Sequence, residues 1–241
     1  MLKIENFEVL GWEHAIRGMR NPMNSWEKSD SNFFDDSEGH VCNICQGHDS
    51  MSLIEIGPND YALMKNLRNA GTDHRKFMRM ITVYLDVTAP LYFWKEFDTY
   101  RVGVEKNSCS TMHKIHAKEF TLEDFSCEHL FDDWSMENEL TYGDDHCYTS
   151  KSGLEAICDI LNHHRMMFLE TKDKKYWWQM IQLLPTSYNQ KRTVMLNYEV
   201  LANIYKSRRH HRLDEWHTFC DWIEELPYSE LITGKEYEVE E

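Results

Sequence analysis

Residues 78–97, MRMITVYLDVTAPLYFWKEF, carry the pattern that decides the fold. In their first part, residues 78–88, apolar side chains alternate with other residues, and many of them are β-branched. The apolar side chains on one face are Ile81, Val83, Leu85 and Val87. A period of two residues with this composition predicts a strand. Pro90 then predicts the start of a helix with the sequence LYFWKEFDTYR, because the first helical turn accommodates proline readily.

The residues before this stretch predict a second strand, a long loop and a helix. The first ten residues, MLKIENFEVL, alternate weakly between apolar and polar side chains, as a strand does. Residues 27–50 are polar and predict a long loop. A helix is expected to begin at Pro58, with Asp60 capping its first N–H groups. It is expected to end at Gly71, because glycine adopts the left-handed conformation easily.

The residues after this stretch predict mainly helices. Residues 119–150 are acidic and loop-rich, and residues 228–241 are expected to form a tail. Apolar spacings of three and four residues predict helices over residues 152–170, 174–184, 192–207 and 213–226. Together the elements indicate an α+β protein, with a small mixed or antiparallel sheet and several helices in a single domain over residues 1–241.

Composition and charge exclude several classes of protein. A chain of 241 residues can bury a substantial core. With 26 Lys and Arg against 41 Asp and Glu, the net charge is −15, which argues against a nucleic acid polymer as partner. No apolar run approaches the roughly 20 residues of a membrane helix, and no leader is recognisable. We therefore expect no membrane association and a cytoplasmic protein, and the odd number of cysteines, seven, indicates reduced thiols.

A candidate zinc site lies in the predicted loop 27–50. Cys42 and Cys45 form a Cys-x-x-Cys pair, with His40 and His48 on either side. Thiolate and imidazole ligands suit zinc, but a closed site takes four ligands and no second pair of this spacing follows. The alternative is two thiols in a loop without a metal, and no metal ligand is assigned.

Two polar concentrations are candidate ligand sites. Residues 206–212, KSRRHHR, form a dense positive cluster on an acidic protein. These cations either stabilise the C-terminal end of a helix or bind a phosphate. Residues 98–101 and 107–111 offer hydroxyls, an amide and a guanidinium to the edge of a flat ring and its phosphates. Neither GxGxxG nor GxxxxGK[ST] occurs, so neither a Rossmann nor a P-loop site is indicated.

Two blocks, residues 72–113 and 181–226, share an order of elements with a known family. The first block contains, in order, His74, the predicted strand, Pro90 and its helix, Thr99-Tyr100-Arg101, and a loop ending at Cys109-Ser110. The second block contains, in order, Leu184-Pro185, Asn197, Leu201, Asn203 and Arg208. In this order and spacing the chain resembles the flavin-dependent thymidylate synthases, as a divergent member.

This resemblance implies an α+β subunit that assembles into a homotetramer, with active sites shared between subunits. It implies the reductive methylation of a pyrimidine nucleotide, dUMP to dTMP or a related reaction. FAD would be the cofactor, and NADPH and methylenetetrahydrofolate would be the co-substrates. FAD would carry the hydride chemistry, while the protein supplies orientation and electrostatics.

The resemblance also implies three groups of site residues. The cofactor-binding residues would be His74, Thr99, Tyr100, Arg101, Asn197 and Asn203. The substrate-binding residues would be Glu96, Cys109, Ser110 and Arg208. The catalytic residues would be Arg101, Ser110 and Arg208, with the two arginines contacting a phosphate or an oxyanion. Cys109 could alternatively act as a nucleophile, if Arg101 lies close enough to favour its thiolate.

The chain departs from the family pattern at several positions. The family's Arg-His-Arg run is Thr99-Tyr100-Arg101 here, and a glutamine is replaced by Glu96. Two further arginines are replaced, one by Thr111 or Met112 and one by Ile181. Because arginine is a common phosphate ligand, three functions stay open. They are an active synthase-like enzyme, a non-catalytic relative that binds a nucleotide or flavin, and a zinc-bearing interaction protein.

Overall fold

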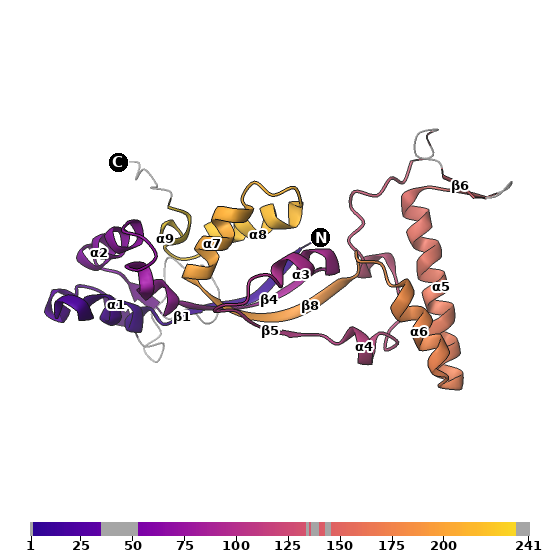
Figure 1. Cartoon of the computed structure of the whole chain (residues 1–241), viewed down its shortest axis with the longest axis horizontal. Coiled ribbons are helices and arrows are strands. Elements are labelled where there is room, and N and C mark those ends of the chain that lie inside the picture. The colour runs from indigo at the N-terminus through magenta and orange to yellow at the C-terminus, as the bar shows by residue number, and fades with distance from the viewer. Residues whose placement is uncertain (1, 35–52, 134, 136–139, 143–145, 235–241) are drawn as a thin grey trace. The chain divides into compact units, whose positions relative to one another are not determined.

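A four-stranded sheet contains segments from distant parts of the sequence (Figure 1). In this computed structural model, which describes residues 2–34, 53–133, 135, 140–142 and 146–234, the strand order is β1-β4-β8-β5. The strands are β1 (Lys3–Leu10), β4 (Thr82–Pro90), β8 (Asn189–Asn197) and β5 (Glu105–Ser108). Two antiparallel pairs are β2 (Asn32–Phe34) with β3 (Leu53–Glu55), and β6 (Leu140–Tyr142) with β7 (His146–Tyr148).

Strand β4 confirms the central prediction from the sequence. The side chains of the predicted apolar face are at most 1% exposed, at Ile81, Val83, Leu85 and Val87. The strand starts at Thr82 rather than at Met78, because residues 75–79 form a 3₁₀ turn. Helix α3 (Leu91–Phe97) begins directly after Pro90, as predicted, and it buries its aromatic side chains Phe93, Trp94 and Phe97.

The chain divides into two compact units. The first unit comprises residues 1–3, 88–99 and 108–192, and the second comprises residues 4–87, 100–107 and 193–241. Helices and a small sheet make the protein α+β, as predicted, while a single domain over residues 1–241 stays a prediction. Within the described ranges, no helix has the length and apolar character needed to cross a membrane.

Helices α5 (Ser150–Thr171) and α6 (Lys174–Leu183) pack against each other in the first unit. They share a buried apolar cluster with the segment that follows the short helix α4 (Thr111–Lys114). The cluster contains Ile115, Phe120, Phe125, Leu154, Cys158, Leu161 and Met180. Both long helices have capped N-termini, because Thr149 accepts the N–H of Ser152 and Asp173 accepts the N–H of Lys175.

The second unit is built on a helical core. Its described helices are α1 (Trp12–Arg20), α2 (Pro58–Asn69), α7 (Tyr198–Arg208), α8 (Asp214–Glu224) and α9 (Glu230–Thr233). Helix α7 contacts α8, α9 and the turn 75–79, and the core includes the fully buried Trp216 and Phe219. Gly11 links β1 to α1 at a φ of +91°, where a Cβ would lie 2.1 Å from the carbonyl oxygen of Met80. Only glycine fits this position without moving the backbone.

The junction of β8 and α7 corrects the predicted helix 192–207. Residues up to Asn197 form strand β8, in which Val194 and Leu196 are buried. Asn197 then caps α7, because its side-chain oxygen accepts the backbone N–H of Val200 at 3.0 Å. The helical prediction is wrong for residues 192–197, because an apolar residue at Val194 fits both a helical spacing and a strand alternation.

The segments expected to be irregular contain some regular structure. Residues 119–150 include a 3₁₀ turn at 122–124 and the β6–β7 pair. The expected tail begins with helix α9, whose Leu231 and Ile232 are buried. Two further 3₁₀ turns span residues 21–23 and 26–28, and the predicted loop 27–50 includes strand β2. In α5, Ile160 follows the apolar spacing that predicts helix 152–170, yet its side chain is 46% exposed.

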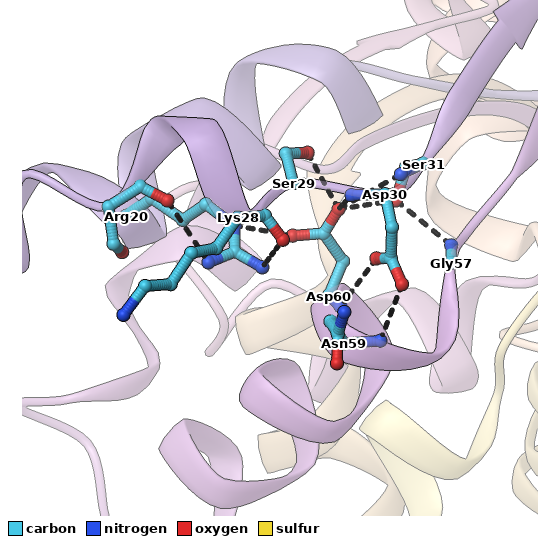
Figure 2. Close-up of polar contacts among 9 residues, drawn as sticks. Arg20, Lys28, Ser29, Asp30, Ser31, Gly57, Asn59 and Asp60 are labelled. Carbon is cyan, nitrogen blue, oxygen red and sulfur yellow. Dashed lines mark hydrogen bonds and ion pairs between the residues drawn. The ribbon is translucent and has the colours of Figure 1, made fainter.

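The cap of helix α2 comes from a different segment than predicted (Figure 2). Asp30 accepts the backbone N–H groups of Asn59 and Asp60, at 2.9 and 3.0 Å. The side chain of Asp60 is fully buried and accepts the Nε–H of Arg20 at 2.6 Å instead. The assignment of Asp60 as the cap is therefore wrong. The predicted end of the helix is confirmed, since α2 stops at Asn69 and Gly71 adopts a φ of +106°.

Asp60 accepts the hydrogen bonds of a buried polar cluster that connects residues 20–31 to α2. It accepts hydrogen bonds from the hydroxyls of Ser29 and Ser31, both at 2.7 Å, besides its ion pair with Arg20. Figure 2 shows these side chains converging on the carboxylate. Burial alone would raise the pKa of Asp60, but the hydrogen bonds from Ser31, Ser29 and Arg20 outweigh burial and hold that pKa below its usual value.

Replacing Asp60 by asparagine should destabilise the fold, because the Arg20 guanidinium would stay buried without its counter-charge. Removing one partner of a buried ion pair costs about 3–5 kcal/mol, which urea unfolding followed by circular dichroism would measure. Because the pKa of Asp60 is lowered by folding, its contribution is present above the unfolded pKa and is lost as the pH falls through the folded pKa. The D60N variant should therefore lose less stability than the wild type on acidification.

The matched control is Asp73→Asn, since Asp73 is an exposed carboxylate of the same unit. Its unfolding free energy should stay within about 0.5 kcal/mol of the wild type. Equal unfolding free energies for D60N and D73N would contradict the role given to the buried pair.

Candidate functional site

The loop after α3 and the C-terminal end of α7 meet in the second unit. Arg208 donates from Nε to the hydroxyl oxygen of Tyr100 at 2.9 Å, although the two residues are 108 positions apart. The Arg208 guanidinium also lies over the ring of the fully buried Trp216, with its Cζ 4.9 Å from the ring centre. A hydrogen bond and a cation–π contact therefore fix the direction of this side chain.

The same loop also approaches the N-terminal end of α7. Gly103 has a φ of +74°, and a Cβ at this position would lie 2.9 Å from Nδ2 of Asn197. Asn197 is the residue that caps α7. Residues 100–103 thus approach α7 at both of its ends, with Tyr100 bonded to Arg208 and Gly103 beside Asn197. Tyr100, Asn197 and Arg208 are three of the residues singled out by the family resemblance.

Arg101 and Thr99 differ in their surroundings. Arg101 is exposed, and its guanidinium has no hydrogen-bonding or ionic partner in the ranges that the structure describes. Thr99, in the first unit, donates its hydroxyl to the carbonyl oxygen of Glu96 at 2.7 Å and so satisfies the end of α3. Thr99 therefore has a local structural role, whereas the Arg101 side chain can reach a ligand.

A basic cavity of 680 Å³ lies beside α7 in the second unit. Its lining includes four cationic side chains, a histidine and one of the predicted cofactor residues. They are Arg68, Arg75, Lys206, Arg209, His210 and Asn203. Among the described residues, no carboxylate lines the cavity. In a chain of net charge −15, such a local excess of cations favours an anionic ligand.

Carboxylates outside the cavity lining neutralise part of its positive charge. Nε of Arg75 lies 2.8 Å from Oε2 of Glu199, without the alignment of a hydrogen bond, and Nη2 of Arg75 donates to Oδ1 of Asn203 at 3.4 Å. Arg209 pairs with Asp221 at 2.5 Å and with Glu224 at 3.4 Å. These carboxylates keep the arginines in place without entering the cavity.

Two cations of the cavity, Arg68 and Lys206, have no carboxylate partner among the residues that the structure describes. The Lys206 ammonium has no ion pair or hydrogen bond within the described part of the chain. Among the described residues, Arg68 donates only to uncharged acceptors, which include the carbonyl oxygens of Leu231 and Ile232 at 3.3 and 3.4 Å. Burial lowers the pKa of Arg68, and the nearby charge of Arg75 lowers it further. An anion placed between these groups would relieve their mutual repulsion.

The remaining predicted residues lie elsewhere. His74 is exposed and precedes the turn 75–79, next to Arg75 rather than on the cavity wall. Cys109 and Ser110 line a separate cavity of the first unit, and Glu96 lies half-buried on α3 of that unit. The zinc candidates Cys42, Cys45, His40 and His48 fall outside the described residues. In the part of the chain that the structure describes, no three metal-ligating side chains cluster.

Three functional candidates carry weak signals in the sequence. Arg68 and Arg75 lie in a mixed polar segment. They reach the same cavity as Lys206 only in the folded chain, where the turn 75–79 packs against both α2 and α7. Trp216 fits the apolar periodicity of α8 and so predicts core packing rather than support for an arginine. Of the three, only Arg75 lies next to a residue that the family resemblance singles out, which is His74.

The fold is that of the flavin-dependent thymidylate synthases. Thymidylate synthase X from Helicobacter pylori, solved with FAD and dUMP, matches with a TM-score of 0.60 at 14% identity, over 96% of this chain and 95% of that chain. The UMP/dUMP methylase PolB from Streptomyces cacaoi, solved with 5-Br UMP, matches with a TM-score of 0.58 at 12% identity, over 97% and 95% of the chains. No family model and no curated protein matches the sequence.

Replacing Tyr100 by phenylalanine should keep the ring and remove the hydroxyl that accepts from Arg208. A hydrogen bond that involves a charged group contributes about 1.5–3 kcal/mol to stability. Because this bond is only partly buried, we expect the unfolding free energy measured in urea to fall by about 1 kcal/mol or more. Tyr84→Phe is the control, because Tyr84 is 41% exposed on β4 of the same unit. Indistinguishable unfolding curves for the two variants would show that the bond does not hold Arg208.

Proposed function

We propose that this protein binds FAD and transfers a one-carbon unit to a pyrimidine nucleotide, as a divergent flavin-dependent methylase. The observation that carries the proposal is the basic cavity beside α7, in a fold shared with thymidylate synthase X and PolB. The expected reaction is the conversion of dUMP to dTMP, or a related methylation. When bound, FAD supplies the hydride chemistry, with NADPH and methylenetetrahydrofolate as co-substrates.

The residues of the basic cavity fit a dinucleotide cofactor. FAD carries two linked phosphates, and Lys206, Arg68 and Arg75 offer cations to them from three different elements. The Asn203 amide can bind a ring edge or a sugar hydroxyl, since it contains both donors and an acceptor. The volume of 680 Å³ suits part of such a ligand. Exposed Arg101 and His74 would complete the contacts from the neighbouring loop and turn.

Arg208 would bind the anionic part of the nucleotide. Tyr100 and Trp216 hold its guanidinium in one direction, which reduces the conformational entropy lost on binding. Ser110 would orient the substrate from the other motif loop, together with Glu96 and Cys109. The assembly into a homotetramer with shared sites is part of this proposal.

A non-catalytic relative is the second candidate function, and two contacts favour it. The hydroxyl of Tyr100, where the family has a histidine, is engaged with Arg208, and the charge of Arg75 is countered by Glu199. Such a protein would retain FAD or a nucleotide without turnover. Binding without formation of a methylated product from dUMP or UMP would favour this second function over the first.

The visible absorption spectrum of the purified protein tests the cofactor directly. Bands of oxidised flavin, with stoichiometric FAD released on heating, are expected. A colourless protein that takes up no added FAD would contradict the first candidate function. It would leave the second one, as a relative that binds a nucleotide alone.

Arg101→Ala should abolish retention of FAD, because the variant removes an exposed guanidinium without a partner within the described ranges. The FAD released per subunit, read by absorbance after heating, measures the effect. Unchanged flavin content would overturn the assignment of Arg101 as a cofactor ligand.

Lys206→Met should weaken FAD binding about tenfold, the effect of losing one charged contact to a phosphate. Fluorescence titration of the apoprotein with FAD would give the dissociation constant. Lys28→Met is the control, since the Lys28 side chain is exposed in the same unit and outside the cavity. The same affinity in both variants would place the cofactor elsewhere.

A further inference from the structure

The basic cavity beside α7 lies where the chain leaves helix α9, which packs against α7 (Figure 1). Ile232 and Thr233, the last two residues of α9, belong to the cavity lining. Gly234 follows them with a φ of +74°, and its N–H donates to the carbonyl oxygen of Glu230 at 2.9 Å. A glycine in this left-handed conformation ends the helix. The residues after Gly234 therefore start beside the cavity.

Arg68 lies at this exit from α9. A Cβ on Gly234 would lie 2.2 Å from Nη2 and 2.6 Å from Nη1 of Arg68, so the guanidinium lies against the backbone of Gly234. The hydrogen bonds from Arg68 to the carbonyl oxygens of Leu231 and Ile232 fix it at the end of the helix. A cavity cation that has no carboxylate partner within the described ranges thus lies next to the segment that follows.

The segment that follows is acidic. Residues 235–241, which lie outside the described residues, have the sequence KEYEVEE. Four glutamates against one lysine give its side chains a net negative charge. Glu236, Glu238 and Glu240 alternate with other residues, and residues two positions apart fall on the same side of an extended chain. The sequence can therefore present a row of carboxylates on one side.

The first two glutamates of the segment are within reach of the cavity. At up to about 3.6 Å per extended residue, Glu236 lies within about 7 Å of Gly234 and Glu238 within about 14 Å, whereas a cavity of 680 Å³, taken as a cube, is roughly 9 Å across. Arg68 and Lys206 both line this cavity, and in the described part of the chain neither has a carboxylate partner. Two carboxylates and two cations can therefore pair in one place.

The covalent link makes such pairs effective although each of them is weak. A short tether raises the effective concentration of a group at its site into the millimolar range. Burial lowers the pKa of Arg68, and the charge of Arg75 lowers that pKa further. A carboxylate beside Arg68 stabilises the charged form of this guanidinium. The cavity therefore suits an acidic segment of the same chain as well as a phosphate.

We propose that residues 235–241 bind the basic cavity, with Glu236 and Glu238 paired to Arg68 and Lys206, and thereby compete with anionic ligands. The segment is an internal counter-ion in the ligand-free protein, and a ligand with phosphates displaces it. The competition follows from charges within this chain, whereas the identity of the ligand as FAD rests on the proposed function.

Inorganic pyrophosphate is a suitable probe, because its binding does not depend on the identity of the ligand. In calorimetric titrations of the cofactor-free full chain, the double variant Glu236→Gln/Glu238→Gln should bind pyrophosphate about three- to tenfold more tightly than the wild type, because it removes two competing ion pairs. The gain should shrink at high salt, which screens such pairs.

The matched control is the double variant Glu13→Gln/Glu27→Gln. Both glutamates are exposed in the same unit and lie outside the cavity lining. This variant changes the net charge by the same amount as E236Q/E238Q. Its affinity for pyrophosphate should equal that of the wild type.

Carbodiimide coupling, followed by mass spectrometry, tests the contact itself. The reagent joins a carboxylate to an amine where the two groups touch, so the wild type should yield peptides that link Glu236 or Glu238 to Lys206. Added pyrophosphate should lower the yield of these peptides. Lys28, an exposed lysine of the same unit outside the cavity, should not couple to the segment.

Three outcomes would overturn the proposal. They are equal pyrophosphate affinities for the wild type and E236Q/E238Q, an equal gain in E13Q/E27Q, and the absence of coupling to Lys206. Titration of the same proteins with FAD separates this proposal from the proposed function. Tighter pyrophosphate binding by E236Q/E238Q in a chain that takes up no FAD would overturn the cofactor and support the competition. FAD binding by both proteins, with no difference in their affinities for FAD or pyrophosphate, would overturn the competition alone.

Discussion

The hydrogen bond from the Val200 N–H to the Asn197 side chain decides where strand β8 ends and helix α7 begins. The arrangement of the candidate cofactor site depends on this boundary, because Asn203, Lys206 and Arg209 all extend from α7 to one cavity. Neighbouring residues on a helix point about 100° apart. A start shifted by one residue would therefore rotate Lys206 away from Arg68 and Arg75. It would also separate Arg208 from Tyr100 and Trp216.

Internal counter-charges explain how a strongly acidic chain maintains a basic cavity. Arginines gathered without compensation would repel one another and lower the stability of the fold. Glu199, Asp221 and Glu224 offset Arg75 and Arg209 from outside the cavity wall. The Arg75–Glu199 contact is close but poorly aligned, so an incoming anion would compete with a weak pair rather than with an ideal one.

The sequence was sufficient for the elements with a single dominant pattern. Strand β4 and helices α3 and α8 follow from apolar periodicity with proline or charged boundaries. It was insufficient where two patterns overlap, as at Val194, and where a cap comes from a remote segment, as Asp30 does for α2. Periodicity carries no information on contacts between distant segments.

The candidate site residues likewise divide into those that the sequence indicated and those that only the folded chain reveals. The family resemblance singled out Asn197, Asn203 and Arg208, and the structure places Asn197 and Arg208 beside the loop 100–103. Arg68 and Trp216 could not be recognised, because their roles arise only in the folded chain. There the turn 75–79 packs against both α2 and α7, and α8 packs against α7. The separation of Cys109 and Ser110 from the basic cavity is likewise a property of the folded chain, not of the motif order.

Gly103 has a consequence for how this protein can vary in evolution. Its backbone lies so close to Asn197 that no space is left for a Cβ, and its φ is one that other residues rarely adopt. Any larger residue at position 103 would press on the amide that starts α7. Positions 103 and 197 should therefore change together or not at all among descendants of this chain. The loop 100–103 and helix α7, although far apart in the sequence, are therefore constrained to evolve together.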